Sequence, residues 1–177
     1  MGLTMKVQGM DELSEKLSRL GEAAGSIASL SLYKGAGVMA DAFTAASKTI
    51  RAEKFHYVFN GHKRLPSYEE AAAVQGKIGI ARFNKNGTEV DTAVGFGNAG
   101  YVEIAGKKKA VRQIANAINS GTSFMDKQPI FRQAVSRTSK AAGAVIVARA
   151  EELIHTLTMG DITTAQAKRY FPNYKFK

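Results

Sequence analysis

The chain has 177 residues, of which 45% are hydrophobic, it carries a net charge of +10, and it contains no cysteine. Its length suits one domain, or one domain with an arm, that buries a substantial core. The missing cysteines exclude disulfides, thiolate metal sites and thiol catalysis. No apolar run is long enough to span a bilayer and no secretory signal pattern opens the chain, so we expect no membrane contact and assembly in the cytoplasm.

The positive charge is concentrated in the second and third parts of the chain. Residues 1–60 sum to +1, residues 61–120 to +4 and residues 121–177 to +5. Such an excess favours contact with nucleic acid or with an acidic protein surface. The alternative is a solvated surface that serves only solubility.

The first 51 residues predict a short strand and two helical segments. Residues 3–8 alternate weakly, Gly9 ends that strand, and Asp11 is a candidate N-cap. We expect Gly21 and Gly25 to break the first helix near its middle. Its apolar face is formed by Leu13, Leu17, Leu20, Ala24 and Ile27.

A second helical segment, residues 26–51, is rich in alanine and contains Gly35 and Gly37. Each glycine costs about 1 kcal/mol relative to alanine inside a helix. Small residues also permit another helix or a subunit to approach closely, and this predicts a packing surface.

The middle of the chain predicts extended structure around one short helix. Within residues 55–66, Phe55, Tyr57 and Phe59 alternate and Pro66 closes the stretch, and Ser67 with Glu70 forms a capping-box pattern for a helix through Val74. Residues 77–83 and 88–96 flank the sequence Asn-Lys-Asn-Gly, the strongest hairpin signal in the chain. Residues 101–105 form a third extended run.

Two further helices and an arm complete the prediction. Residues 110–120 form an amphipathic helix that ends at Gly121, and the last helix runs over 129–157 with Pro129 at its first position. We expect one α+β domain over residues 1–158, in which long N- and C-terminal helices pack on a small antiparallel sheet, and an extended C-terminal arm over 159–177. The buried face of the last helix is predicted to comprise Phe131, Val135, Thr138, Ala142, Val145, Ile146, Leu153 and Leu157.

The chain offers no pattern typical of an enzyme, a metal site or a cofactor site. Residues 95–100 match G-x-G-x-x-G, but an extended run follows where a dinucleotide site needs a helix. Adjacent side chains on a helix diverge by about 100°. The pairs Glu69–Glu70 and Glu151–Glu152 are therefore interpreted as solvated faces.

The densest positive cluster comprises Lys107, Lys108, Lys109 and Arg112. As a patch that leads from a loop into a helix, it could contact phosphate oxygens of a DNA channel or the surface of a partner. The alternative is an exposed, solvated loop.

The end of the chain combines aromatic and basic residues in a way that favours an intersubunit arm. Four aromatic residues among the last ten are too many for a segment that stays free in water. Burial on a neighbouring subunit would satisfy them, and single-stranded nucleic acid is a less favoured partner. The predicted arm residues are Lys168, Arg169, Tyr170, Phe171, Tyr174 and Phe176.

Two blocks resemble the neck proteins of tailed bacteriophages, known as tail-completion or head–tail joining proteins. The first block, residues 121–135, has Gly-Thr-Ser, a polar spacer and then a motif core of Gln128, Pro129, Phe131 and Arg132 near the start of the last helix. The second, residues 9–20, resembles the opening of the same proteins. The family's Pro-x-x-Thr-Gly-x-Leu segment is missing from residues 49–55.

The resemblance implies a structural virion protein, located in the neck and assembled in the host cytoplasm. It implies a homo-oligomeric ring of six subunits that joins the head connector to the tail tube or terminator protein around double-stranded DNA. A tail terminator, a minor tail component and a stand-alone, sequence-independent DNA-binding protein remain the alternatives.

Overall fold

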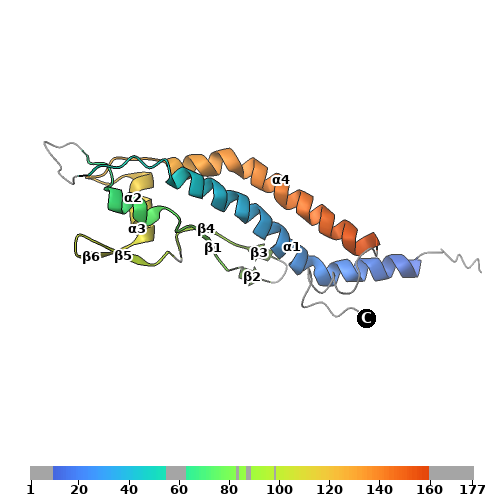
Figure 1. The fold of residues 1–177 in the computed structure, drawn as a ribbon. Helices are drawn as coiled ribbons and strands as arrows, with labels where there is room; N and C mark the ends of the chain where they lie inside the picture. The colour runs from blue at the N-terminus through green and yellow to red at the C-terminus, as the bar shows by residue number, and fades with distance from the viewer. Residues whose placement is uncertain (1–9, 55–62, 83, 87–88, 98, 160–177) are drawn as a thin grey trace, which may run out of the picture.

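Two long helices, α1 (Met10–Ser47) and α4 (Ile130–Met159), lie side by side and form an elongated body (Figure 1). The computed structural model describes residues 10–54, 63–82, 84–86, 89–97 and 99–159. The predicted strand at 3–8, most of the alternating run at 55–66 and the arm from residue 160 onward lie outside the described residues.

The remaining elements gather under α1 and at the end of the body where α1 ends and α4 begins (Figure 1). The predicted α+β class is confirmed. The other helices are α2 (Tyr68–Val74) and α3 (Val111–Ser120). The strands are β1 (Gly79–Ile80), β2 (Asn84–Asn86), β3 (Glu89–Asp91), β4 (Val94–Gly95), β5 (Tyr101–Ile104) and β6 (Lys107–Ala110).

Helix α1 is continuous, so the predicted break at Gly21 and Gly25 is wrong. The propensity cost of two glycines, about 1 kcal/mol each, is offset by tertiary packing of the same turns. Ala23 and Ile27 are buried in a cluster with Leu153 and Leu157 of α4.

Close approach of the two helices is confirmed at Gly35. A Cβ atom built on Gly35 would lie 2.6 Å from Cδ1 of Ile146 and 3.1 Å from the carbonyl oxygen of Ala142. The missing side chain therefore lets α4 pack directly on the α1 backbone. At Gly37 a Cβ would meet nothing within 4 Å.

Within the described residues, the strands form three separate antiparallel pairs in place of a single sheet. The predicted hairpin is confirmed, with Ile80 opposite Val94, but residues 84–86, predicted as its loop, form β2, in which Asn86 lies opposite Glu89. Residues 107–109, predicted as a loop, instead belong to β6, which pairs with β5. Ala105 and Gly106, both with positive φ, form the two-residue turn that joins these strands.

The main core surrounds α3, and the start of α4 completes it. It contains Val74, Ile104, Val111, Ile114, Ala115, Ile118, Met125 and Phe131. Pro129 precedes the first helical residue of α4, and its carbonyl accepts the N–H of Gln133 at 3.0 Å. Val135 was predicted to be buried, but it is 40% exposed, although Phe131 one turn earlier contacts Phe43 of α1.

Candidate functional site

The Gly-Thr-Ser sequence of the first resembling block forms a closed turn. Gly121 has a φ of +76°, and a Cβ there would lie 3.2 Å from the carbonyl oxygen of Met125. The N–H of Thr122 donates to that same carbonyl at 3.0 Å, while the Thr122 hydroxyl accepts the N–H of Met125 at 3.0 Å. Glycine is therefore required by both conformation and space, and threonine by its hydroxyl.

This turn is attached to the segment that leads into α2. The N–H of Arg64 donates to the carbonyl of Phe124, and the N–H of Asp126 donates to the carbonyl of Arg64, both at 2.9 Å. Met125 between them is buried in the core. Backbone hydrogen bonds thus join residues 63–67 to residues 121–128. We call these two segments, together with the start of α4, the junction.

Gln128 connects the junction to the end of α1. Its side-chain amide is buried, accepts the N–H of Arg51 and donates to the Arg51 carbonyl, each at 2.9 Å. Its backbone N–H donates to the carbonyl of Ile118 at the end of α3. One residue therefore contacts the ends of two helices just before a third begins.

Phe131 anchors the first turn of α4 in the core. Its ring centroid lies 5.5 Å from that of Phe43 and 5.1 Å from that of Phe96. The N–H of Arg132 donates to Oδ1 of Asn119 at 3.3 Å, and the residue itself is exposed. Of the predicted motif core, Gln128 and Phe131 thus hold the fold together, Pro129 precedes the helix, and Arg132 lies on the surface.

A buried carboxylate lies beside the junction. Glu70 is 2% exposed, and its carboxylate accepts two hydrogen bonds from the Arg64 guanidinium, at 2.7 and 3.1 Å, and one from Lys109 at 3.0 Å. The N–H of Ser67 also donates to it, which confirms the predicted capping box. The interpretation of Glu70 as part of a solvated face is therefore wrong, because two cations and the cap draw it inward.

The charge of Glu70 is stabilised despite its burial. Desolvation alone would raise the pKa of this carboxyl, but the hydrogen bonds from Arg64, Ser67 and Lys109 outweigh it and lower the pKa from 4.5 to about 2. Glu70 is therefore ionised at neutral pH, with both oxygens occupied, and is unsuited to act as a general base. Sequence reasoning missed Arg64, for which no local pattern gives a signal.

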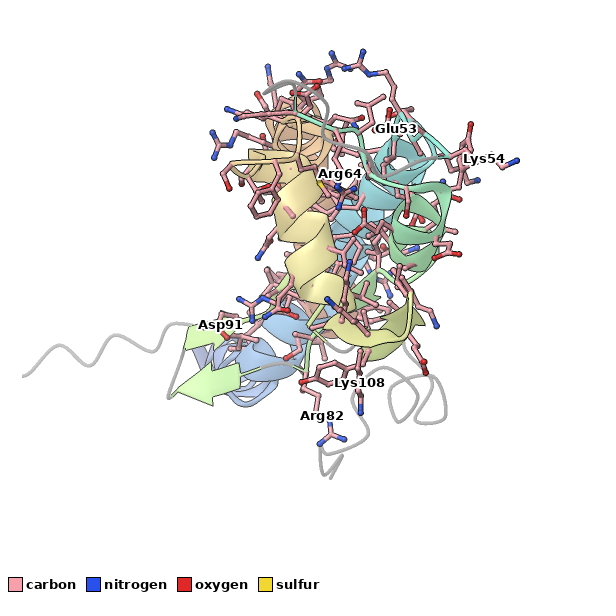
Figure 2. The ribbon with its side chains drawn as sticks, turned by 90° about the vertical axis from the view of Figure 1, so that its left-hand side faces the viewer. Glu53, Lys54, Arg64, Arg82, Asp91 and Lys108 are labelled. Atoms are coloured by element: carbon pink, nitrogen blue, oxygen red, sulfur yellow. The ribbon has the colours of Figure 1, made fainter. Side chains whose placement is uncertain are left out.

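The four residues of the predicted basic patch do not share one face. Lys109 lies opposite Val102 and points to Glu70. Lys108 lies opposite Glu103 on the other face of the strand pair, with its Nζ 5.0 Å from the centroid of the Tyr101 ring. Figure 2 shows Lys108 projecting from the lower side, away from Arg64. Lys107 and Arg112 are exposed.

Arg112 lies at a cavity of about 220 Å³ between α3 and the start of α4. Aromatic rings line one part of it, and three polar side chains from one face of α3 line another. The lining includes Phe43, Phe96, Phe131, Arg112, Asn116 and Asn119. The lining contains no carboxylate, imidazole, hydroxyl or thiol group.

Two general features of the described part of the chain bear on function. Across residues 10–54, 63–82, 84–86, 89–97 and 99–159, no group of three or more His, Asp or Glu side chains could hold a metal ion. None of the described helices contains a stretch apolar and long enough to cross a membrane. The predicted arm, Lys168 to Phe176, lies outside the described residues.

Comparison with known proteins adds no relative. No protein-family model matches the chain, and neither curated proteins nor solved structures give a significant match. The likeness to phage neck proteins therefore depends on the two blocks themselves.

Proposed function

We propose that this chain is a structural subunit of the neck of a tailed bacteriophage, a tail-completion or head–tail connector protein that forms a ring around the DNA channel. The observation that carries the proposal is the position of the resembling block. Through a turn, a buried amide and a core phenylalanine, residues 121–132 hold three helices and the 63–67 segment together.

The chemistry of the block supports a structural role. The side chains of Thr122 and Gln128 form hydrogen bonds to backbone atoms of the same chain, and Phe131 is buried. These three side chains therefore serve the fold, while Phe124 and Arg132 of the same block are exposed. This is the expected character of a sequence signature in an assembly protein.

The surface around the junction supports association with other subunits. Three aromatic residues are exposed on three different segments: Phe124 in the Gly-Thr-Ser loop of the junction, Tyr68 on α2 directly after the 63–67 segment, and Tyr101 on β5 beside Lys108. Tyrosine and phenylalanine are enriched in the cores of protein interfaces. Repeated head-to-tail contact with a closing rotation generates a ring from one kind of chain, and the resemblance implies six copies.

The arm and the outward basic residues have assigned roles in this proposal. Residues 159–177 dock on a neighbouring subunit or on the adjoining ring, with their aromatic side chains in pockets. The exposed Lys107, Lys108 and Arg112 remain available to contact the DNA or the partner ring from different sides, whereas Lys109 is engaged by Glu70. The alternatives within the same virion are that the chain is a tail terminator or a minor tail component.

Electron microscopy of the purified full-length protein tests the proposal. We expect six-fold rings, and we expect the variant Tyr68→Ser/Tyr101→Ser/Phe124→Ser to remain folded but to lose them. Tyr33→Ser, at an exposed tyrosine in the middle of α1, is the matched control and should keep the rings. A protein that stays monomeric at every concentration and in the assembled neck would overturn the proposal.

A phage carrying this gene provides the second test. Interrupting the gene should give filled or leaking heads and separate tails, and supplying the protein in trans should restore complete virions. Normal virions without the protein would contradict the proposal. A monomer whose DNA affinity falls steeply with salt would favour the stand-alone DNA-binding alternative instead.

A further inference from the structure

One part of α4 is apolar on every side. The residues from Ala141 to Ala148 include no polar side chain. The inward residues Ala142 and Ile146 pack on α1. Ala141, Ala144, Val147 and Ala148 are nevertheless exposed. A helix that is hydrophobic on every side is normally buried on every side. We therefore expect another protein surface to cover the outer side of α4.

The exposed side of α4 carries a regular stripe, which we call the α4 outer stripe. Successive residues of the stripe are separated alternately by four and by three positions, so they share one helix face. The largest apolar members are well exposed, Val147 at 56% and Ile154 at 40%. The stripe comprises Gln133, Arg137, Lys140, Ala144, Val147, Glu151, Ile154 and Thr158.

The α4 outer stripe is complementary to itself when the second copy runs in the opposite direction. A twofold axis midway between residues 145 and 146 maps every member of the stripe onto another member. The resulting opposite pairs are Ala144 with Val147, Lys140 with Glu151, Arg137 with Ile154, and Gln133 with Thr158.

The chemistry of each pair suits such a contact. At the centre, a small Ala144 faces the larger Val147, which permits two helices to approach closely. On either side, Lys140 meets Glu151, so charge complementarity occurs twice in the symmetric pair. Further out, the aliphatic stem of Arg137 covers Ile154 while its guanidinium stays in water.

We propose that two copies of this chain pair through the α4 outer stripe, antiparallel and about a twofold axis. The contact is isologous, with the same patch used by both copies. It differs from the head-to-tail contact that closes a ring and does not depend on the neck function. The free protein thus exists as pairs, whatever larger assembly it joins.

Cross-linking tests the geometry directly, because the natural chain has no cysteine. The variant Ala144→Cys/Val147→Cys should form a disulfide-linked dimer under mild oxidation, because each new thiol faces the other position in the partner. Val135→Cys, at an exposed valine of the same helix outside the stripe, is the matched control and should stay uncoupled. Equal cross-linking of both proteins would overturn the proposal.

A charge exchange in that double-cysteine protein tests the register. Lys140→Glu alone, or Glu151→Lys alone, places like charges opposite each other twice and should slow cross-linking at least about tenfold. The combination Lys140→Glu/Glu151→Lys should restore the original rate. Failure of the combination to recover would overturn the twofold arrangement, since only a contact between the stripe and itself repairs both changes together.

Light scattering of the cysteine-free protein provides an independent measurement. Val147→Glu should lower the mass of the smallest species from twice the 19.0 kDa of one chain to a single chain, whereas Val135→Glu should not. A wild-type protein with the mass of one chain at its highest soluble concentration would refute the pairing. Rings lost in the Tyr68/Tyr101/Phe124 variant while stripe cross-linking persists would separate this proposal from the neck function.

Discussion

The side-chain amide of Gln128 pairs with the backbone of Arg51, 77 residues earlier, through two hydrogen bonds of 2.9 Å. The amide thereby occupies the place that a neighbouring strand would take, with one donor and one acceptor in register. This single side chain fixes the end of the segment after α1 against the start of α4. Position 128 therefore needs a side chain that both donates and accepts a hydrogen bond, as the amide of glutamine does.

Gln128→Ala should destabilise the fold by about 1–3 kcal/mol, because a buried amide and its two hydrogen bonds are removed. Urea denaturation followed by circular dichroism measures the loss. Gln128→Glu should be nearly as damaging, since a carboxylate cannot donate to the Arg51 carbonyl. The exposed Gln133→Ala serves as control, and an equal effect of both alanine variants would contradict the assigned role.

Glu70 should make the stability of the protein depend on pH in the acidic range. Its pKa is about 2 in the folded chain against 4.5 when unfolded, so the unfolded state binds more protons between these values. The contribution, about 3 kcal/mol, is present above pH 4.5 and is lost as the pH falls towards 2. Unfolding free energies across this range measure it.

Glu70→Gln separates this effect from general acid sensitivity. At pH 7 the variant should lose about 3 kcal/mol, because Arg64 and Lys109 keep their charges without the carboxylate. The difference from wild type should shrink as the pH falls from 4.5 to 2. Glu69→Gln, at the exposed neighbour, should show neither change, and a pH-independent loss in Glu70→Gln would refute the interpretation.

Phe131→Ala should cost about 3–5 kcal/mol, the usual loss for a buried phenylalanine. The removed ring contacts Phe43 and Phe96, and a cavity would open at the first turn of α4. The denaturant midpoint measures this change. Phe124→Ala, at an exposed ring in the same block, should leave the midpoint nearly unchanged.

Gly35→Ala and Gly37→Ala should change stability in opposite directions although the two glycines lie only two residues apart. A methyl group at Gly35 collides with Ile146 and should cost about 1–3 kcal/mol. At Gly37 nothing lies within 4 Å, so alanine should stabilise by about 0.5–1 kcal/mol through helix propensity. Thermal melts compare the two, and Ile146→Ala should relieve most of the Gly35→Ala penalty.

Neutralising the basic cluster should divide it into two groups. Lys107→Gln/Lys108→Gln/Arg112→Gln should leave the melting temperature almost unchanged and weaken head–tail joining or DNA retention. Lys109→Gln should instead lower the melting temperature, because Glu70 loses a hydrogen-bonded cation. An unchanged phage titre for the triple variant would assign these side chains to a solvated surface.

Local patterns predicted the parts of the fold that depend on neighbouring residues. The Ser67–Glu70 box and the end of α3 at Gly121 were predicted within about a residue, and the hairpin was predicted as such although its loop was placed over β2, since caps and turns act over short distances. The pairing of Gly35 with Ile146 was foreseen only as a capacity for close approach. Nothing in the sequence named the partner.

The errors have one cause in common, which is tertiary contact overriding local preference. Gly21 and Gly25 remain helical because α4 packs beside them, and β6 is a strand because its lysines pair with β5. Glu70 is buried because Arg64 and Lys109 arrive from outside its own helix. The candidate site was found through residues 121–132, but its ion cluster needed the structure.

The pairing of α1 with α4 also has a consequence for synthesis of the chain. Gly35 leaves the ribosome long before Ile146. The apolar face of α1 therefore stays exposed to water until most of the remaining chain has been synthesised. Contacts between residues so far apart in sequence form slowly, and exposed apolar surface on a nascent chain invites aggregation. Production of this protein should therefore depend on chaperones and on low temperature more than its size alone suggests.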